Sequence, residues 1–193
     1  MSPYSIMGET ERLVIRPYTL DDYEAWKEPY GQRLPSQHRH DDGWQDMSDY
    51  SYGMYMERVE RFRKLAEQDI AYIFGVFRKE DGACLGGVDL ATLIRDEFQW
   101  ARMGYALHNQ YWRNGYGKEA ASKLLDIAFH ELRFHRVEVQ INEDNPASIG
   151  LAKSIGMEYE CTRKGFIYEF NEWTDNMIFY KNTDNPAPPI YGV

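Results

Sequence analysis

Two glycines, Gly115 and Gly117, lie two positions apart in the stretch YWRNGYGKEA at 111–120, just before a run that predicts a helix. A loop entering a helix leaves backbone N–H groups unpaired, and the helix dipole makes that end attractive to phosphate. Glycine permits backbone angles and a close approach that a Cβ atom would obstruct. Arg113 and Lys118 add positive charge. The stretch therefore predicts a cradle for a diphosphate.

Two other phosphate-binding motifs fit this stretch poorly. A Walker A loop requires Ser or Thr after Gly-Lys, and here Glu119 follows Lys118. A dinucleotide-binding fingerprint requires a third glycine where this chain has Ala120. A plain tight turn before a helix is the structural alternative, because short glycine motifs are weak evidence on their own.

The stretch HRHDD at 38–42 is a second group of residues that could do chemistry. Two histidines beside two aspartates could bind zinc or nickel. No third soft ligand is evident, so a solvated loop is the preferred interpretation and no metal is expected. Four aspartates in this region would attract any cationic amine without selecting one: Asp41, Asp42, Asp46 and Asp49.

The bulk composition narrows the classes of partner. The 193 residues suit one domain with a real core, and 22 Lys+Arg against 31 Asp+Glu give a formal net charge of -9. An acidic chain disfavours nucleic acid and anionic membrane, and favours a cationic or amine-bearing partner. Cys84 and Cys161 are far apart, so reduced thiols and a cytoplasmic location are expected. The N-terminal residues lack the features of a signal peptide.

The hydrophobic pattern predicts the elements that must position the glycine stretch, in the order β-α-α-β-β-β-α-β-α-β-β. The predicted strands are 11–18, 70–79, 83–93, 98–107, 136–141, 157–170 and 172–182. The predicted helices begin at residue 19 and cover 50–68, about 117–132, and 145–156. No repeat or inner linker interrupts them. A single domain over 1–183 is expected, with a proline-rich tail at 184–193.

Residues 103–157 resemble the GNAT superfamily of N-acetyltransferases, and in particular the branch of the ribosomal-protein acetyltransferases RimJ and RimL. That branch reads GY-x-L-x-x-x-x-W-x-x-GY-[GA]-x-EA, then AF, HR-[VI], N-x-x-S and GF. The matching residues here are Gly104, Tyr105, Leu107, Trp112, Gly115, Tyr116, Gly117, Glu119, Ala120, Ala128, Phe129, His135, Arg136, Val137, Asn145, Ser148, Gly156 and Met157. With the opening ETERLVIRPYTLDDYEAW and the segment EWTDNMIFY, the resemblance spans about 9–181.

The resemblance implies a GNAT fold of the α/β (α+β) class. Its mixed central sheet would have about seven strands with an antiparallel first half, splayed strands around a CoA site, and about four helices. Acetyl-CoA is implied as co-substrate, with no metal. The residues expected to bind it are Tyr105, Ala106, Leu107, Trp112, Arg113, Asn114, Gly115, Tyr116, Gly117, Lys118, Asn145 and Ser148.

The implied reaction is transfer of the acetyl group to a primary amine, which attacks directly in a ternary complex. Ser148 is expected to protonate the departing thiolate, and the backbone N–H of Leu107 to stabilise the oxyanion. Alternatively, Ser148 only bonds locally in the first turn of its helix. Glu169 and Glu138 are the candidates for the base that deprotonates the amine.

The acceptor would be a protein N-terminus or a small cationic amine, bound by a monomer or a homodimer. Trp44, Tyr50 and Tyr52 are expected to line its pocket, because the corresponding region of relatives lies over the acceptor site. Two departures bear on catalysis. Arg102 stands where many relatives have glutamate, and Ala152 where the superfamily favours tyrosine. They motivate the alternative of a non-catalytic CoA-sensing or interaction module.

Overall fold

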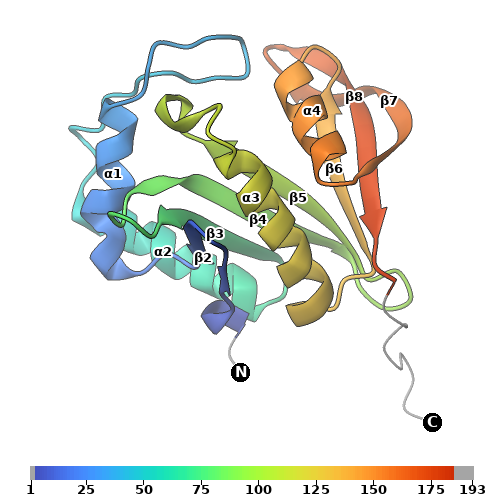
Figure 1. The fold of residues 1–193 in the computed structure, drawn as a ribbon, viewed down its shortest axis with the longest axis horizontal. Helices are drawn as coiled ribbons and strands as arrows, with labels where there is room; N and C mark the ends of the chain where they lie inside the picture. The colour runs from blue at the N-terminus through green and yellow to red at the C-terminus, as the bar shows by residue number, and fades with distance from the viewer. Residues whose placement is uncertain (1–2, 185–193) are drawn as a thin grey trace.

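In the computed structural model, which describes residues 3–184, eight strands form one sheet in the order β1-β2-β3-β4-β5-β6-β8-β7 (Figure 1). The strands are β1 (Gly8–Glu9), β2 (Leu13–Arg16), β3 (Ala71–Arg78), β4 (Cys84–Ile94), β5 (Trp100–Leu107), β6 (Arg136–Asn142), β7 (Glu158–Glu169) and β8 (Glu172–Asn182). The helices are α1 (Tyr23–Gly31), α2 (Tyr52–Glu67), α3 (Tyr116–Asp126) and α4 (Pro146–Ser154). The predicted order of elements is confirmed, with the two-residue β1 as an addition.

The sheet divides between β5 and β6, its one parallel pair among the described strands. Only three positions of these strands pair, from Trp100 opposite Arg136 to Arg102 opposite Glu138. Beyond Arg102 the two strands diverge, as Figure 1 shows for the yellow-green β5 and the orange β6. The antiparallel first half and the splayed central strands are thus confirmed.

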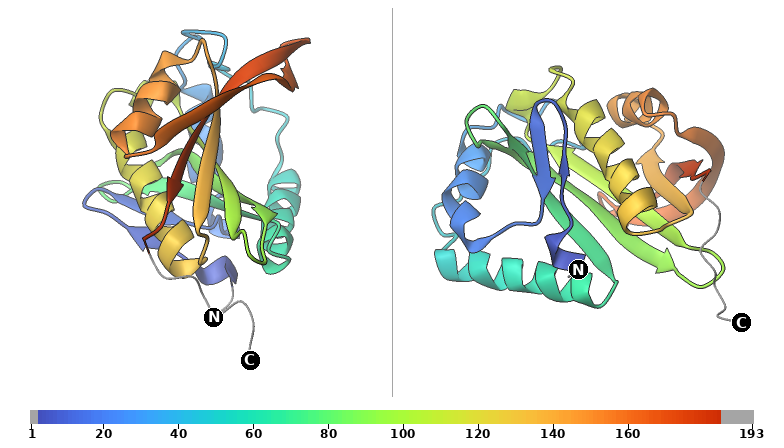
Figure 2. Two further views of the ribbon diagram at one scale, coloured as in Figure 1. Left: turned by 90° about the vertical axis from the view of Figure 1, so that its right-hand side faces the viewer. Right: turned by 60° about the horizontal axis from the view of Figure 1, so that its bottom comes forward.

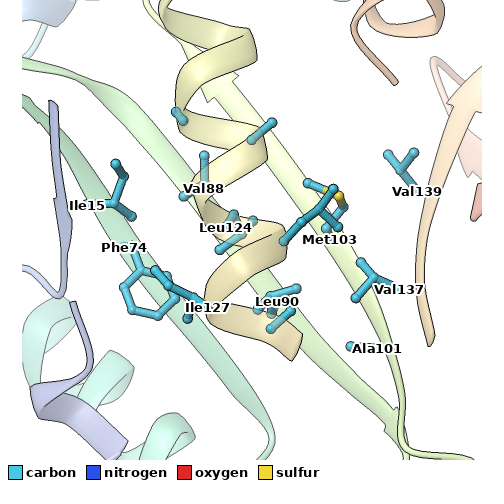
Figure 3. Close-up of a cluster of buried hydrophobic side chains, with 14 of the residues drawn as sticks. Ile15, Phe74, Val88, Leu90, Ala101, Met103, Leu124, Ile127, Val137 and Val139 are labelled. Carbon is cyan, nitrogen blue, oxygen red and sulfur yellow. The ribbon is translucent and has the colours of Figure 1, made fainter. Parts of the chain in front are cut away.

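Helix α3 covers one face of the sheet because its apolar residues recur at helical spacing. Leu124 and Ala121 are fully buried in this layer. Leu124 lies over Val88, Leu90 and Met103 of the sheet (Figure 3). Full burial of one such leucine contributes roughly 1.5–3 kcal/mol relative to exposure. The sequence predicted one helix to about 132, whereas a π-helical turn, Ile127–Glu131, follows α3.

Helices α1 and α2 cover the opposite face, while α4 lies on the same side as α3 (Figure 2). The α1–α2 face holds a second apolar cluster that includes Trp26, Tyr55 and Val59. Helix α2 begins two residues after the predicted start at 50. Its N-cap is Ser51, whose hydroxyl accepts a hydrogen bond from the Met54 amide at 3.3 Å. Each face of the sheet therefore has its own helical layer.

Both cysteines, Cys84 and Cys161, are free thiols. Among the described residues, no helix is long and apolar enough to cross a membrane. The tail predicted at 184–193 lies, from residue 185 onward, outside the described residues.

Candidate functional site

A cavity of about 720 Å³ opens where the two halves of the sheet separate. Its wall comes from both helical layers: α1, α2 and the loop between them on one side, and the beginnings of α3 and α4 on the other. Strands β4 and β5 supply the floor between these two ends, so one space reaches from the glycine stretch to the α1–α2 face of the sheet.

The glycine stretch forms the entrance to α3, as the sequence predicted. Gly115 is the N-cap residue with φ 80°, a left-handed conformation that favours glycine. At Gly117 an added Cβ would meet nothing closer than 3.6 Å, the distance to a methyl group of Leu151. Packing within the protein therefore does not require glycine at 117. The space that the missing side chain leaves is part of the cavity.

Glu119 fixes this entrance to Arg12, the residue before strand β2. Its carboxylate accepts hydrogen bonds from the Arg12 backbone amide at 3.0 Å and from Arg12 Nε at 2.8 Å. Arg12 also donates to the Asn114 carbonyl at 3.0 Å. The loop is thus held from outside the cavity, and its inner side stays open to a ligand.

Most of the residues expected to bind CoA are brought together on the cavity wall. Nine of them line it: Tyr105, Ala106, Leu107, Trp112, Arg113, Tyr116, Gly117, Asn145 and Ser148. Three others of the set lie outside the lining: Asn114, Gly115 and Lys118. Trp112 is held in position by its indole N–H, which donates to the Leu107 carbonyl at 2.8 Å.

Ser148 and Tyr105 form a hydroxyl pair on this wall. Their oxygens are 2.8 Å apart, and either can be the donor. Asn145 caps α4 by accepting a hydrogen bond from the Ser148 amide at 3.1 Å, which fixes the serine in the first turn. Burial raises the pKa of Tyr105, while its bond to Ser148 acts in the opposite direction. The phenol is therefore protonated at neutral pH and can supply a proton.

Asp89 is a carboxylate on the cavity wall that the sequence reasoning missed. It lies on β4 opposite Gly104 of β5, and a Cβ at Gly104 would come within 2.5 Å of its Oδ1. Burial raises the pKa of Asp89, and the positive charge of Arg102 partly offsets this. The available signal was a lone acid in the apolar strand around Val88 and Leu90.

The two glutamates predicted as bases lie elsewhere. Glu138 is almost fully buried, accepts a hydrogen bond from Arg136 at 2.8 Å, and faces a separate cavity of about 400 Å³. Glu169 accepts hydrogen bonds from the Asn142 amide group at 2.6 Å and the Thr174 hydroxyl at 2.7 Å. Neither lines the cavity that contains Ser148.

The loop between α1 and α2 crosses the cavity and contacts both halves of the molecule. Its anchor is the buried Asn109, which exchanges hydrogen bonds with the backbone of Leu34 at 2.7 and 2.8 Å and donates to Asp41 at 3.0 Å. Farther along, His38 stacks on Trp112 with ring centroids 5.5 Å apart. His40 lies 2.7 Å from Asp144, on the loop that follows β6.

These contacts change the interpretation of the HRHDD stretch. Asp41 is buried and organises the loop, so it does not attract a cation from solvent. Burial opposes its ionisation, but bonds from Asn109 and from the Gln37 and Gly43 amides hold the pKa of Asp41 below its usual range. The charge of Arg33 acts in the same direction.

The three aromatics expected around the acceptor lie outside the cavity wall. Trp44 and Tyr52 are largely exposed, and Tyr50 packs on Trp26 with ring centroids 4.9 Å apart. Other residues of the α1–α2 layer line the end of the cavity beside Asp89: Tyr18, Trp26, Tyr30, Arg58 and Phe62.

Comparisons with known proteins show the family of the chain. A family model described as an acetyltransferase (GNAT) domain matches residues 12–158. The Bacillus subtilis protein named "Probable N-acetyltransferase YjcK" is 30% identical over 122 residues, which are 63% of this chain and 67% of that protein. The [ribosomal protein uS5]-alanine N-acetyltransferase of Escherichia coli is 21% identical, with 93% of this chain and 92% of that protein covered.

Two solved structures share the fold. The ribosomal-protein-S5-alanine acetyltransferase of Vibrio fischeri has a TM-score of 0.77 at 19% identity and covers 95% of this chain and 100% of its own. RimJ of Mycobacterium smegmatis, solved with CoA-disulfide, has a TM-score of 0.76 at 17% identity and covers 92% of this chain and 87% of its own.

Proposed function

The chain belongs to the GNAT acetyltransferase family, and from this premise we propose that it transfers an acetyl group from acetyl-CoA to a primary amine. The amine attacks the thioester directly in a ternary complex. One observation carries the proposal: a single cavity contains the glycine stretch, the Tyr105–Ser148 pair and the carboxylate of Asp89. Phosphate binding, a proton donor and a proton acceptor are what this reaction requires.

The wall of the cavity fits coenzyme A. The amides at the start of α3, with Arg113 beside them and no side chain at Gly117, suit a diphosphate. Beyond Arg102, β5 has no partner strand on its β6 side, so the backbone of Tyr105 to Leu107 is available to an extended ligand, apart from the Leu107 carbonyl that accepts from Trp112. Acetyl-CoA would supply the activated acetyl group there.

The Tyr105–Ser148 pair is proposed to protonate the thiolate that leaves. Ser148 gives its proton to the sulfur and is resupplied by Tyr105, because the two hydroxyls are within hydrogen-bond distance, and Tyr105 regains a proton from solvent. The backbone N–H of Leu107 is proposed to stabilise the oxyanion as the amine attacks.

Asp89 is proposed as the general base. Amines are ammonium ions at neutral pH, and only the free amine is nucleophilic, so one proton must leave before attack. A carboxylate whose pKa is raised by burial accepts that proton more readily than an ordinary one. Gly104 supports this role because its missing side chain leaves room for the carboxylate.

The acceptor is proposed to be a protein N-terminus or a small amine. The Escherichia coli relative is named for acetylation of an alanine of ribosomal protein uS5, which makes a protein N-terminus a reasonable candidate. The second candidate function is a non-catalytic CoA-sensing module, favoured by Arg102 and the fully buried Ala152 at the two divergent positions. Tyr105 weighs against this second candidate. Its hydroxyl, on strand β5, lies within hydrogen-bond distance of Ser148 on α4, so the cavity keeps a proton donor.

The test is release of the CoA thiol from acetyl-CoA with a panel of primary amines, beside calorimetric titration of CoA. We expect acetylation of at least one amine and its loss in Asp89→Asn. CoA binding without turnover on any amine would contradict the enzymatic proposal and support the sensing module. A protein stabilised more by ATP or NAD than by CoA would contradict the CoA site.

A further inference from the structure

We propose that the acetylated amine also carries an anionic group, a carboxylate or a phosphate, and that Arg58 and Arg33 bind this group. The inference rests on the proposed acetyl transfer, since it concerns the acceptor end of the same cavity. The proposed anion subsite lies at the acceptor end of the cavity, between helix α2 and the α1–α2 loop.

Arg58 is an arginine at the cavity wall without a carboxylate partner among residues 3–184. Its guanidinium carbon lies 5.5 Å from the ring centroid of Trp26 and 5.3 Å from that of Phe62. Arg63 on the same helix, by contrast, pairs with Glu60 and Glu67 at 2.7 Å each. A guanidinium packed against aromatic faces keeps its N–H edge available for a planar anion.

Arg33 supplies a second, independent observation. Its side chain is nine-tenths buried and lines the cavity, yet its Nε has no hydrogen-bond partner among the described residues. Its Nη2 lies 3.2 Å from Asp41, which already accepts bonds from Asn109 and from the Gly43 amide. A buried charged donor without an acceptor is costly, so an acceptor oxygen on the ligand is the favoured partner.

The small number of acidic residues on the cavity wall also favours an acceptor that carries an anionic group. Its acidic residues are Asp42 and Asp89 alone among the described lining, and the Asp42 side chain is 79% exposed. Asp89 faces the amine in the proposed reaction, and Arg33 shares its charge with Asp41, which leaves Arg58 as the cation without a carboxylate partner at this end of the described lining. A polyamine would bring further positive charges toward both arginines, which is unfavourable beside apolar walls.

His108 adds no positive charge to this part of the cavity. Burial, and after it the charge of Arg33, lower the pKa of His108 to about 4. The imidazole is therefore neutral at physiological pH and adds no charge of its own. The net charge of -9 for the chain favours cationic amines in general, but the residues around the acceptor select one that also bears an anion.

Two sources could provide this chemistry: a small amino acid or amino phosphate, or a protein N-terminus followed by acidic residues. Matched acceptor pairs separate them. O-phosphoethanolamine is compared with ethanolamine, alanine with alaninamide, and an Ala-Asp-Glu peptide with Ala-Asn-Gln, and spermidine serves as the cationic extreme. We expect kcat/KM to be about tenfold or more higher for the anionic member of at least one pair.

The decisive variant is Arg58→Gln, which should bring that ratio of kcat/KM toward one. Arg61→Gln, an exposed arginine of α2 outside the cavity lining, is the matched control and should keep the wild-type ratio. Arg33→Gln is less suitable because it also removes the ion pair to Asp41. Equal kcat/KM for both members of every pair in the wild type would overturn the subsite while leaving acetyl transfer intact.

A binding measurement keeps the subsite testable without turnover. Calorimetry of O-phosphoethanolamine and of the acidic peptide, with CoA present, should show affinity that falls about tenfold in Arg58→Gln. If this holds while no amine is acetylated, the subsite stands and the proposed reaction fails. If neither anion binds better than its neutral counterpart, and no preference appears in turnover, the subsite is wrong.

Discussion

The phenolic oxygen of Tyr105 lies 2.8 Å from the hydroxyl oxygen of Ser148, so strand β5 and the first turn of α4 meet through two side-chain hydroxyls. Strand β5 belongs to the first half of the sheet, and α4 packs against β6 of the second half. The two halves separate beyond Arg102. The pair therefore forms where the cavity passes between the halves, which is where a thiolate would leave in the proposed reaction.

Ser148→Ala should lower kcat by about 10²–10⁴-fold, the range typical for loss of a general acid. Affinity for CoA, measured by calorimetry, should change little, because one hydroxyl is a small part of the contact. Tyr105→Phe should give a smaller loss if Ser148 donates directly. Ser154→Ala is the control, since that residue is exposed and its hydroxyl bonds, among residues 3–184, to the Leu151 carbonyl of its own helix. Unchanged kcat in both Ser148→Ala and Tyr105→Phe would refute the proton-donor role.

Asp89→Asn should lower kcat/KM by about 10²–10⁴-fold, because an amide cannot accept the ammonium proton. In the wild type, kcat/KM should rise with pH through a pKa above the ordinary aspartate value of about 3.9. This rise of kcat/KM should be absent from the pH profile of Asp89→Asn. A variant that retains the wild-type rate and profile would remove Asp89 from the mechanism.

The same carboxyl has a predictable effect on stability. A pKa raised in the folded state gives a contribution that is fully present below the unfolded pKa and is lost as pH rises through the folded pKa. Ionised Asp89 should therefore destabilise the fold at neutral pH. Thermal unfolding should show Asp89→Asn to be more stable than the wild type at pH 7, with the difference disappearing below about pH 3.9.

Gly117→Val should separate CoA binding from folding. The branch motif allows alanine at this position, so a larger side chain is the informative change. Valine has a higher helix propensity than glycine, and the nearest atom to a Cβ here is a Leu151 methyl group at 3.6 Å. The melting temperature should therefore stay near the wild-type value, whereas CoA affinity should fall about tenfold because the isopropyl group occupies the phosphate space. Gly150→Val in α4, where a Cβ meets nothing within 4 Å, is the control and should not weaken CoA binding. Wild-type CoA affinity in Gly117→Val would show that the diphosphate binds elsewhere.

The fold could be predicted largely because its information is local. Alternating apolar residues mark the strands, and the stripe through Ala121, Leu124 and Leu125 marks α3. The entrance to α3 could be predicted from Gly115, because a residue with left-handed backbone angles before a helix is usually glycine, and the glycine is visible in the sequence. The π-helical turn Ile127–Glu131 was missed because the apolar spacing there also fits an α-helix.

The acceptor end could not be predicted in the same way. Its geometry depends on contacts between distant residues, such as the bond from Asn109 to Asp41 across 68 positions. These contacts bring the loop across the cavity and leave Trp44 in solvent. Asp89 was missed because a single acid in a strand has no motif, and only the register opposite Gly104 reveals its place in the cavity.

Asn109→Ala tests whether the α1–α2 loop is held over the cavity by this buried amide. Its loss leaves the amide and the carbonyl of Leu34 without their side-chain partner and removes one of the two bonds to Asp41 Oδ2, which keeps the bond from the Gln37 amide. The free energy of unfolding should therefore fall by about 1–3 kcal/mol. For a chain of this size, that corresponds to a melting temperature lower by about 2–4 °C per kcal/mol. KM for the acceptor should rise more than KM for acetyl-CoA, because the loop contacts the acceptor end.

Acidification provides the internal check on this anchor. The pKa of Asp41 is lowered in the folded state, so its stabilising contribution is present above the ordinary aspartate value of about 3.9 and is lost as pH falls through the lower folded pKa. Asn109→Ala removes the largest of the bonds that lower this pKa, so the variant should lose less stability on acidification than the wild type.

Asp46→Asn, an exposed position of the same loop, should retain the wild-type KM for the acceptor. An Asn109→Ala protein with wild-type stability and unchanged KM for both substrates would show that the loop is positioned by other contacts, with the stack of His38 on Trp112 the next to test.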